Sequence, residues 1–357
     1  MKSQLSESRV RRSAPRASTG LHILECSDQG RWNNFVRTSP DSTVCHLHAW
    51  KKVIEQAYGH RTFYLAATDE SGIQGVLPLV LTRSPLFGTH LTSMPYLDYG
   101  GILADHDTAK RALLERGREI AVAEKATLNL RYREEPGLGL PTSPGRVTML
   151  LELGSSEADL WARLPSERRN RIRKGRTNGL VASFHGQEGL RAFFHVFARN
   201  MRDLGSPVHA LEFFQSILEH MNEQATILLV RDGQRTIGAA MCLFYRETMS
   251  IPWVSSLRSH FHRCPNQILY WEAMRYGVAN GYRLLDFGRS ARGDGTFEAK
   301  RQWGSHPHEL HWTYQSLESG RPAEPSHNRA TVMRLWRRLP VPLATVMGPW
   351  IRKGLPS

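Results

Sequence analysis

The two halves of the chain show the same order of predicted elements, and this repeat is the feature that most restricts how the sequence can fold. Each half has two strands joined by a tight turn, an extended segment, a helix and a buried strand, at nearly equal spacing. We therefore predict an α+β fold built from two similar units; the alternative is two unrelated segments that share a common order of elements. The segments of the first half are 62–68, 73–81, 91–105, 107–125 and 126–132, and those of the second are 225–230, 235–245, 249–257, 266–281 and 282–287.

The segment between the halves is strongly basic. Pro165 is expected to end one short helix, and Ser166 is expected to cap the next, SERRNRIRKGRTNG. The arginines and the lysine of this predicted helix surround most of its axis. They could attract an anionic partner, or they could simply be solvated. The predicted organisation is a disordered basic tail (1–20), a first unit (21–153), a basic linker helix (154–180), a second unit (181–318) and an amphipathic basic segment (328–355).

The amphipathic segment 328–355 carries Trp336 and Trp350 among apolar residues at helical spacing, with arginines off that face. Such a pattern is typical of a helix that lies in a membrane surface. It is equally consistent with a helix that packs on the protein's own core. Pro340 and the pair Gly348–Pro349 are expected to prevent one long helix.

The net charge of +14 favours a polyanionic partner, which could be nucleic acid, anionic lipid or a phosphate-bearing substrate. The chain is predicted to be cytoplasmic, and peripheral at the inner membrane face. The first twenty residues lack the apolar core of a signal peptide, and no apolar run is long enough to span a membrane. The four cysteines show no CxxC spacing and fit reduced core residues.

A glycine-rich basic stretch, DFGRSARGDGTFEAKRQWG (286–304), follows the last buried strand of the repeat. We interpret it as a mobile loop in which Arg289 and Arg292 close over the phosphates of a substrate. Asp286, at the end of the strand, could pair with Arg289 and fix the loop. Cations of the linker helix would extend the same field toward a tRNA or a pyrophosphate, and three of them are counted as substrate-binding candidates: Arg169, Arg173 and Lys174.

The twofold unit, the basic helix RRNRIRKGRTNGL and the stretch FEAKRQWG together resemble the FemAB-like branch of the GNAT acyltransferases. The similarity extends to FemAB-related proteins of exosortase (PEP-CTERM) systems, and covers roughly residues 20 to 315 in order of elements. It implies tandem GNAT-like domains with mixed sheets flanked by helices. It also implies N-acyl or aminoacyl transfer to an amine of a cell-envelope polysaccharide or peptidoglycan-type precursor, in exopolysaccharide systems.

The resemblance also suggests site residues. Lys300 of FEAKRQWG matches a lysine of the family's active-site cleft and is the candidate electrostatic catalyst; it could equally be a solvated surface lysine. Asp98 of PYLDYGG would orient or deprotonate the attacking amine, unless it only forms a turn before Gly100. Tyr96 and Tyr99 would hydrogen-bond the substrate, and Trp303 completes the substrate-binding candidates.

The acyl donor could be aminoacyl-tRNA or acyl-CoA, and no cofactor is certain. A CoA-binding GNAT domain would carry a Q/R-x-x-G-x-G/A turn that enters a helix. The stretch RTIGAA (235–240) has those letters but lies in a predicted hairpin strand, so we interpret it as a chance match. The alternative function is an acyl-CoA-dependent N-acetyltransferase acting on a soluble amine or amino sugar.

Two further possibilities rest on weaker patterns. The histidines of HPHELHW and HLH have no metal-ligand spacing, and no metal site is predicted. A non-enzymatic nucleic-acid-binding protein is suggested by the basic charge alone, because the chain has no helix-turn-helix or RNP signature.

Overall fold

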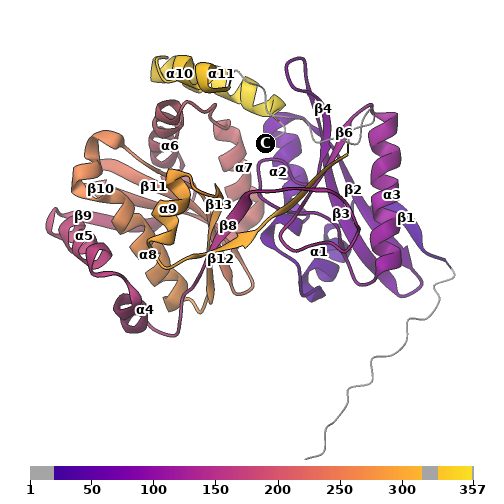
Figure 1. Ribbon diagram of the computed structural model, residues 1–357, viewed down its shortest axis with the longest axis horizontal. Helices are drawn as coiled ribbons and strands as arrows, with labels where there is room; N and C mark the ends of the chain where they lie inside the picture. The colour runs from indigo at the N-terminus through magenta and orange to yellow at the C-terminus, as the bar shows by residue number, and fades with distance from the viewer. Residues whose placement is uncertain (1–19, 316–328, 356–357) are drawn as a thin grey trace, which may run out of the picture.

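The computed structural model describes residues 20–315 and 329–355, which form two mixed β-sheets side by side with helices around them (Figure 1). This confirms the predicted α+β fold with two mixed sheets. The predicted basic tail, apart from Gly20, lies outside the described residues, as do positions 316–318 and 328 of the predicted segments.

Within the described residues the first sheet has eight strands in the order β1–β2–β3–β4–β6–β15–β7, with β5 paired to β3. Its strands β4 and β6 are parallel neighbours, and the helix α3 connects β5 to β6. The bounds are β1 (His22–Glu25), β2 (Arg61–Asp69), β3 (Gly72–Ser84), β4 (Gly88–Thr92), β5 (Leu103–Ala104), β6 (Thr127–Tyr132), β7 (Thr142–Ser143) and β15 (His311–Gln315).

The second sheet has seven strands in the described part of the chain, in the order β14–β8–β13–β12–β11–β10–β9. It repeats the pattern of the first sheet: a hairpin, a further strand, a helix and a strand parallel to the preceding one. The predicted repeat is therefore confirmed. The bounds are β8 (Arg146–Glu152), β9 (Leu180–His185), β10 (Ala225–Asp232), β11 (Arg235–Tyr245), β12 (Thr248–Ser256), β13 (Leu284–Ala291) and β14 (His306–Glu309).

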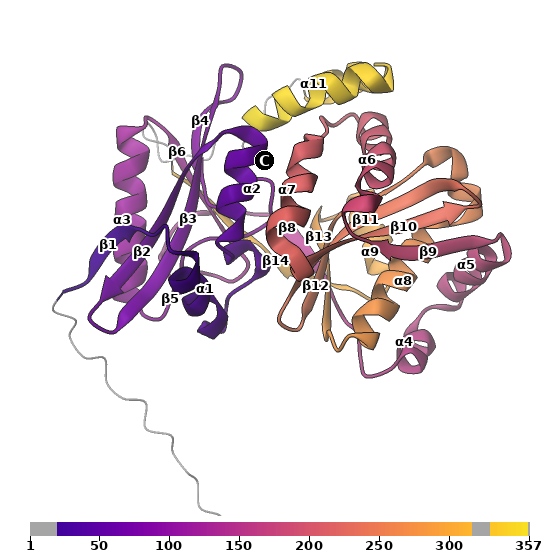
Figure 2. The same cartoon turned by 180° about the vertical axis from the view of Figure 1, so that it is seen from behind.

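Helices cover the sheets and join the two units. Helix α2 of the first unit packs against α7 of the second, with the rings of Trp50 and Phe213 stacked 6.4 Å apart, so one apolar core extends across the junction. Helices α10 and α11 lie above the second unit, and α11 reaches the junction, where it contacts α6 of the second unit and β3 of the first (Figures 1 and 2). The bounds are α1 (Gln29–Thr38), α2 (Ala49–Tyr58), α3 (Asp107–Ala123), α4 (Glu157–Arg163), α5 (Ser166–Thr177), α6 (Leu190–Leu204), α7 (Leu211–Met221), α8 (Pro265–Ala279), α9 (Gly295–Arg301), α10 (Arg329–Trp336) and α11 (Val341–Gly354).

The strand pairing crosses the predicted unit boundaries at two places. Strand β8 falls at the end of the predicted first unit but pairs with β13 in the second sheet. Strand β15 falls in the predicted second unit but pairs with β6 in the first sheet. The chain thus passes between the sheets at 144–145 and again at Leu310, whose backbone N–H donates to the Arg146 carbonyl at 3.0 Å.

Three local predictions are wrong. The stretch after β13 does not form a mobile loop that returns to the sheet, because Asp294 caps a short helix, α9, through a bond from the Phe297 N–H of 2.7 Å. Ser166 is the first residue of α5 and Pro165 is its N-cap, so the serine does not cap the helix. Pro340 does separate α10 from α11, but Pro349 lies inside α11 and does not break it.

The turn between Asp98 and β5 leaves no room for a side chain at Gly101. A β-carbon there would lie 2.4 Å from the Tyr132 ring and 2.9 Å from the Arg131 carbonyl. We expect Gly101→Ala to lower the free energy of unfolding by about 1–3 kcal/mol, measured by denaturant unfolding. Gly295→Ala is the matched control, because nothing lies within 4 Å of its β-carbon position. Equal effects of the two substitutions would contradict this account.

Candidate active site between the two sheets

Asp98 connects the first sheet to the second. It lies in the segment that follows β4, and its Oδ2 accepts the backbone N–H of Arg289 in β13 at 3.0 Å. Its Oδ1 lies 3.5 Å from the Arg289 Nε, and the Asp98 side chain keeps 21% of its surface exposed. The carboxylate is therefore held by the second sheet while remaining accessible to a small substrate.

The segment of β13 that Asp98 binds is irregular. The register of β13 against β8 shifts between Asp286 and Arg289, and Gly288 has a φ of +75°. Buried Asp286 holds this bulge: its carboxylate accepts from the Tyr99 hydroxyl, from Thr148 Oγ1 and from the Gly288 N–H at 2.8 Å. Burial raises the pKa of Asp286. The predicted pairing of Asp286 with Arg289 is wrong, because Arg289 pairs with Asp98 instead.

Lys300 holds the same segment through two hydrogen bonds. Its Nζ donates to the carbonyls of Gly288 and Arg289 at 2.9 and 2.8 Å. Burial lowers the pKa of Lys300 to about 8, and the carboxylates of Asp98 and Asp286 oppose that shift. Lys300 is half-buried and its ammonium is bound to two backbone carbonyls, so it is not a freely solvated surface lysine. Asp98 and Lys300, the two predicted catalytic residues, therefore both bind the backbone of the dipeptide Gly288–Arg289.

Three arginines surround the ring of Trp312 beside Asp98. The guanidinium carbons of Arg131, Arg146 and Arg289 lie 4.1, 4.8 and 4.8 Å from the ring centroid. The Trp312 Nε1 donates to the Asp98 carbonyl at 2.8 Å, which fixes the ring against the site. Burial, followed by the charge of Arg289, lowers the pKa of Arg131 to about 9. This arginine cluster creates a positive field that suits a phosphate or carboxylate.

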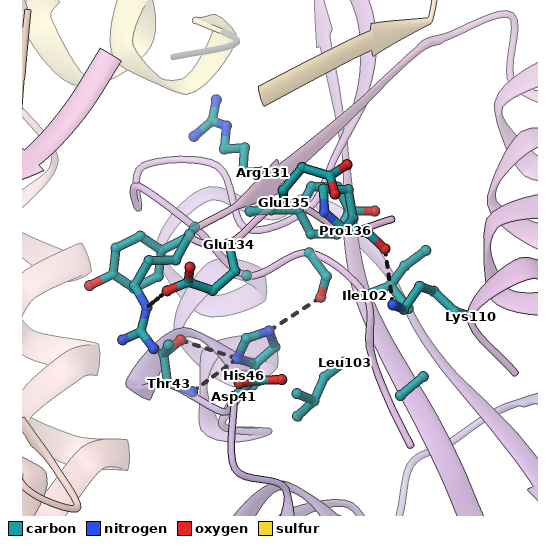
Figure 3. Close-up of a pocket in the computed structure, with 16 residues that line it drawn as sticks. Asp41, Thr43, His46, Ile102, Leu103, Lys110, Arg131, Glu134, Glu135 and Pro136 are labelled. Carbon is teal, nitrogen blue, oxygen red and sulfur yellow. Dashed lines mark hydrogen bonds and ion pairs between the residues drawn. The ribbon is translucent and has the colours of Figure 1, made fainter. Parts of the chain in front are cut away.

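Two cavities have lining residues near this constellation, but Asp98, Gly288, Arg289 and Lys300 line neither of them. The larger, of about 430 Å³, is lined from both units, and the smaller, of about 100 Å³, lies in the first unit. Thr43, Tyr99 and Arg133 line both, so the cavities adjoin, and Tyr99 links them to Asp286. Figure 3 shows the smaller cavity, with His46 facing inward and Arg131 directed away from it. The larger is lined by Pro40, Ser42, Thr43, Val44, Tyr99, Arg133, Tyr245, Arg246, Glu247, Thr248 and Ser250.

The other predicted site residues lie in different surroundings, and not all of them are near Asp98 and Lys300. Tyr99 lines the cavities, but its hydroxyl is bound to Asp286. Tyr96 is buried beneath α11, where its hydroxyl bonds His60 Nε2 at 2.8 Å and the Lys353 carbonyl at 3.0 Å. Trp303 is buried against Tyr270, with the ring centroids 5.5 Å apart. Arg292 is exposed and forms an ion pair with Glu309.

The cations of α5 are not part of this constellation. Helix α5 packs on α8 and β9, at the end of the second unit away from the first sheet (Figures 1 and 2). Arg169 bonds the Ala162 carbonyl, Arg173 bonds Asn170, and Lys174 is exposed. Arg169, Arg173 and Lys174 therefore do not extend the field of the arginine cluster.

Sequence reasoning missed Arg131, Arg146, Trp312 and the role of Asp286. Arg131 offered a signal, because it interrupts a strand whose other residues read as buried, and a charge there needs a polar neighbour. Trp312 and Arg146 offered none, because Trp312 reaches the site only through the pairing of β15 with β6, and Arg146 only through the pairing of β8 with β13. Within residues 20–315 and 329–355, no group of three or more His, Cys, Asp or Glu side chains could hold a metal ion.

Comparisons with known proteins define the class of the fold. Residues 166–301 match the family model of the acetyltransferase (GNAT) domain. The chain thus carries a GNAT-type acyltransferase domain, and the whole structure has the tandem arrangement of that fold. No curated protein matches the sequence.

Solved structures show the same fold across both units. FemX aligns with a TM-score of 0.67 at 16% identity, covering 83% of this chain and 97% of FemX. A tandem GNAT protein from the clavulanic acid biosynthesis pathway aligns with a TM-score of 0.54 at 14% identity, covering 85% of this chain and 100% of the other. L-PGS from Bacillus licheniformis aligns with a TM-score of 0.55 at 11% identity, covering 87% and 98%.

Proposed function

We propose that this protein is an N-acyltransferase that moves an acyl or aminoacyl group onto an amine at the junction of the two sheets. One observation carries the proposal. Asp98 of the first unit and Lys300 of the second both bind the dipeptide Gly288–Arg289. Tyr99, the residue after Asp98, lines a cavity that both units form, although Asp98 and the dipeptide themselves do not line it. The GNAT-domain match supports acyl transfer as the reaction.

The chemistry assigns a role to each group. The nitrogen lone pair of the acceptor attacks the acyl carbonyl carbon, a C–N bond forms, and the bond from that carbon to the donor's oxygen or sulfur breaks. Asp98 accepts the proton that the amine loses, and that proton then passes to the leaving oxygen or sulfur. Lys300 acts as a positioning residue: it fixes the dipeptide that binds Asp98 and keeps a positive charge near the reacting groups.

The arginine cluster is the proposed anion subsite. Arg289, whose side chain is 34% exposed, is the member best placed to bind a phosphate of the donor or acceptor. Arg292 is bound to Glu309 and Tyr96 lies beneath α11, so neither is assigned to substrate in this structure. Tyr99 contributes its ring to the cavity wall rather than a free hydroxyl.

In the second unit, which carries the GNAT-domain match, the strand-to-helix junction does not fit the pyrophosphate of CoA. Strand β12 is followed by Leu257–Cys264 and then α8, and this stretch contains no glycine. Its N–H groups are used internally, as in the bonds from His260 to Leu257 and from Cys264 to Phe261, and Pro265 at the helix start has no N–H. The motif-like RTIGAA lies in strand β11, as predicted. Aminoacyl-tRNA is therefore the favoured donor.

An acyl-CoA-dependent N-acetyltransferase is the second candidate, favoured by the description of the matching family model. A thermal-shift comparison separates the two. We expect aminoacyl-tRNA to raise the melting temperature saturably and acetyl-CoA to leave it unchanged, because only a ligand that binds the folded state stabilises it. Arg289→Gln is expected to weaken the tRNA effect, whereas Arg173→Gln, on distant α5, is the matched control. A shift with acetyl-CoA alone would establish the second candidate, and no shift with either donor would contradict both.

For the acceptor, we propose an amine of a cell-envelope polysaccharide or peptidoglycan-type precursor. The proposal draws on the sequence resemblance to FemAB-like proteins and on the fold shared with FemX. The link to exopolysaccharide and exosortase systems, and a cytoplasmic location, remain predictions from that resemblance.

A further inference from the structure

The outer face of α11 is apolar and uncovered. Leu343, Val346, Met347 and Trp350 are all exposed, and Trp350 keeps 82% of its surface. An apolar helix face packed on the protein's own core would be buried. Instead, the interior packing of α11 uses other residues, so this stripe has no partner within the described residues.

The inner face of α11 is firmly held. Ala344 is buried, and Gly348 lies so close to Val208 that a β-carbon there would be 2.7 Å from its side chain. Near the end of the helix, Arg352 bonds His209 at 3.1 Å, and the Lys353 carbonyl accepts the Tyr96 hydroxyl. The alternative in which this segment packs on the protein's own core therefore holds for one face of α11, while the opposite face is open and the membrane-surface alternative stays a prediction.

A second exposed apolar element lies beside α11. Leu86 and Phe87 form the tip of the β3–β4 hairpin, and Leu86 keeps 80% of its surface. The hairpin projects at the same edge of the molecule as α11 in both views (Figures 1 and 2). At its base Ser84 contacts the end of α11, because a β-carbon on Gly354 would lie 2.7 Å from the Ser84 Oγ. We call the outer face of α11 together with this tip the apolar edge.

The surroundings of the apolar edge are basic. Residues 329–355 contain five arginines and one lysine and no acidic residue, and Arg83 precedes the hairpin tip. Exposed Arg338 and Lys353 flank the apolar stripe, while Arg337 bonds the Leu204 carbonyl. Apolar side chains with Trp on a segment whose charged residues are all cations match the surface of a bilayer that contains anionic lipid, although Arg83 itself is paired with Glu124. A second protein copy would carry the same positive charge, which disfavours self-association through this edge.

We propose that the apolar edge docks on the surface of an anionic lipid bilayer. The described helices include none that is long and apolar enough to cross a membrane, so the contact is at the interface. Trp350 and Leu86 enter the headgroup region and the arginines contact lipid phosphates. Helix α11 also reaches the junction of the units, where the Lys353 carbonyl accepts the hydroxyl of Tyr96, two residues before Asp98 (Figure 1). Docking therefore brings the candidate active site close to the lipid surface, and the inference stands independently of the proposed reaction.

The test is flotation of the full chain with vesicles of phosphatidylglycerol and phosphatidylcholine. We expect binding to these vesicles, and weak binding to phosphatidylcholine alone. Val346→Glu, Trp350→Glu and Leu86→Glu are each expected to weaken binding about tenfold, because each places a charge where apolar surface would be buried. Val181→Glu is the matched control, since Val181 is 64% exposed but lies on the distant strand β9. All four sites are exposed, so circular dichroism should show unchanged folding.

Other outcomes overturn the proposal. Equal binding of the Val181→Glu and Trp350→Glu proteins would show that net charge, not the apolar edge, drives adsorption. A wild-type dimer that Trp350→Glu converts to a monomer, seen by sedimentation, would assign the edge to self-association. No flotation of the wild-type protein would reject a lipid partner outright. Quenching of tryptophan fluorescence by brominated lipid, lost in Trp350→Phe, would support the docking geometry directly.

Discussion

Replacing Asp98 by asparagine is expected to lower the rate of acyl transfer by about 10²–10⁴-fold, which is the range for a positioned general base. The amide has nearly the shape of the carboxylate and can still accept the Arg289 N–H through its oxygen. It cannot accept a proton from the amine. The measurement is the single-turnover rate with the donor identified by the thermal-shift experiment.

The control for this substitution is Asp232→Asn. Asp232 also forms an ion pair with an arginine, Arg263, at 2.7 Å, and its side chain is 28% exposed against 21% for Asp98. It lies on β10, away from the junction of the sheets. An Asp98→Asn protein as active as the Asp232→Asn protein would remove the proposed base, and only the binding roles of the site would survive.

Replacing Lys300 by methionine is expected to lower the transfer rate by about 100-fold, because displacement of a reacting group by about 1 Å can cost that much. The methionine cannot donate to the carbonyls of Gly288 and Arg289, so the segment that orients Asp98 loses two bonds of 2.9 and 2.8 Å. Lys300→Arg restores a cation and is expected to recover part of the rate. Full activity of the Lys300→Met variant would contradict the positioning role.

The pH dependence of this effect separates electrostatics from folding. With the pKa of Lys300 near 8, the ratio of wild-type to methionine-variant rates should fall as the pH rises through about 8, because the folded protein loses this charge. Stability should change in the opposite sense. Between pH 8 and the ordinary lysine pKa, the unfolded chain binds more protons at this position than the folded chain, so the stability of the wild type relative to the variant rises with pH. If the rate ratio and the relative stability changed with pH in the same direction, Lys300 would have a structural role only.

The repeated elements could be predicted because each depends on local patterning. Strand β6 and helix α3 bury residues at the spacing that the sequence shows, and Gly59 ends α2 in the left-handed conformation as expected. Helix α9 was missed for a local reason as well. Its glycines and arginines were interpreted as a loop, whereas Asp294 supplies a cap that begins a short helix.

The composition of the site could be predicted only in part. Asp98, Lys300 and Arg289 were found from the sequence, partly through the resemblance. The partners that hold them could not be, because Thr148 and Trp312 reach the site through pairings of β8 with β13 and of β15 with β6. Such contacts join residues more than a hundred positions apart. Nothing in the spacing of either stretch indicates which sheet it will join.

The paired passages of the chain between the sheets also restrict how the units can move. The second connection, Leu310, is hydrogen-bonded to Arg146, which directly follows the first connection at 144–145. Together with the apolar core shared by the two units, this doubled connection resists separation of the units. Cleavage of the backbone at 144–145 would therefore leave the halves joined, and neither half could be produced as a separate folded fragment by cutting the gene at that point.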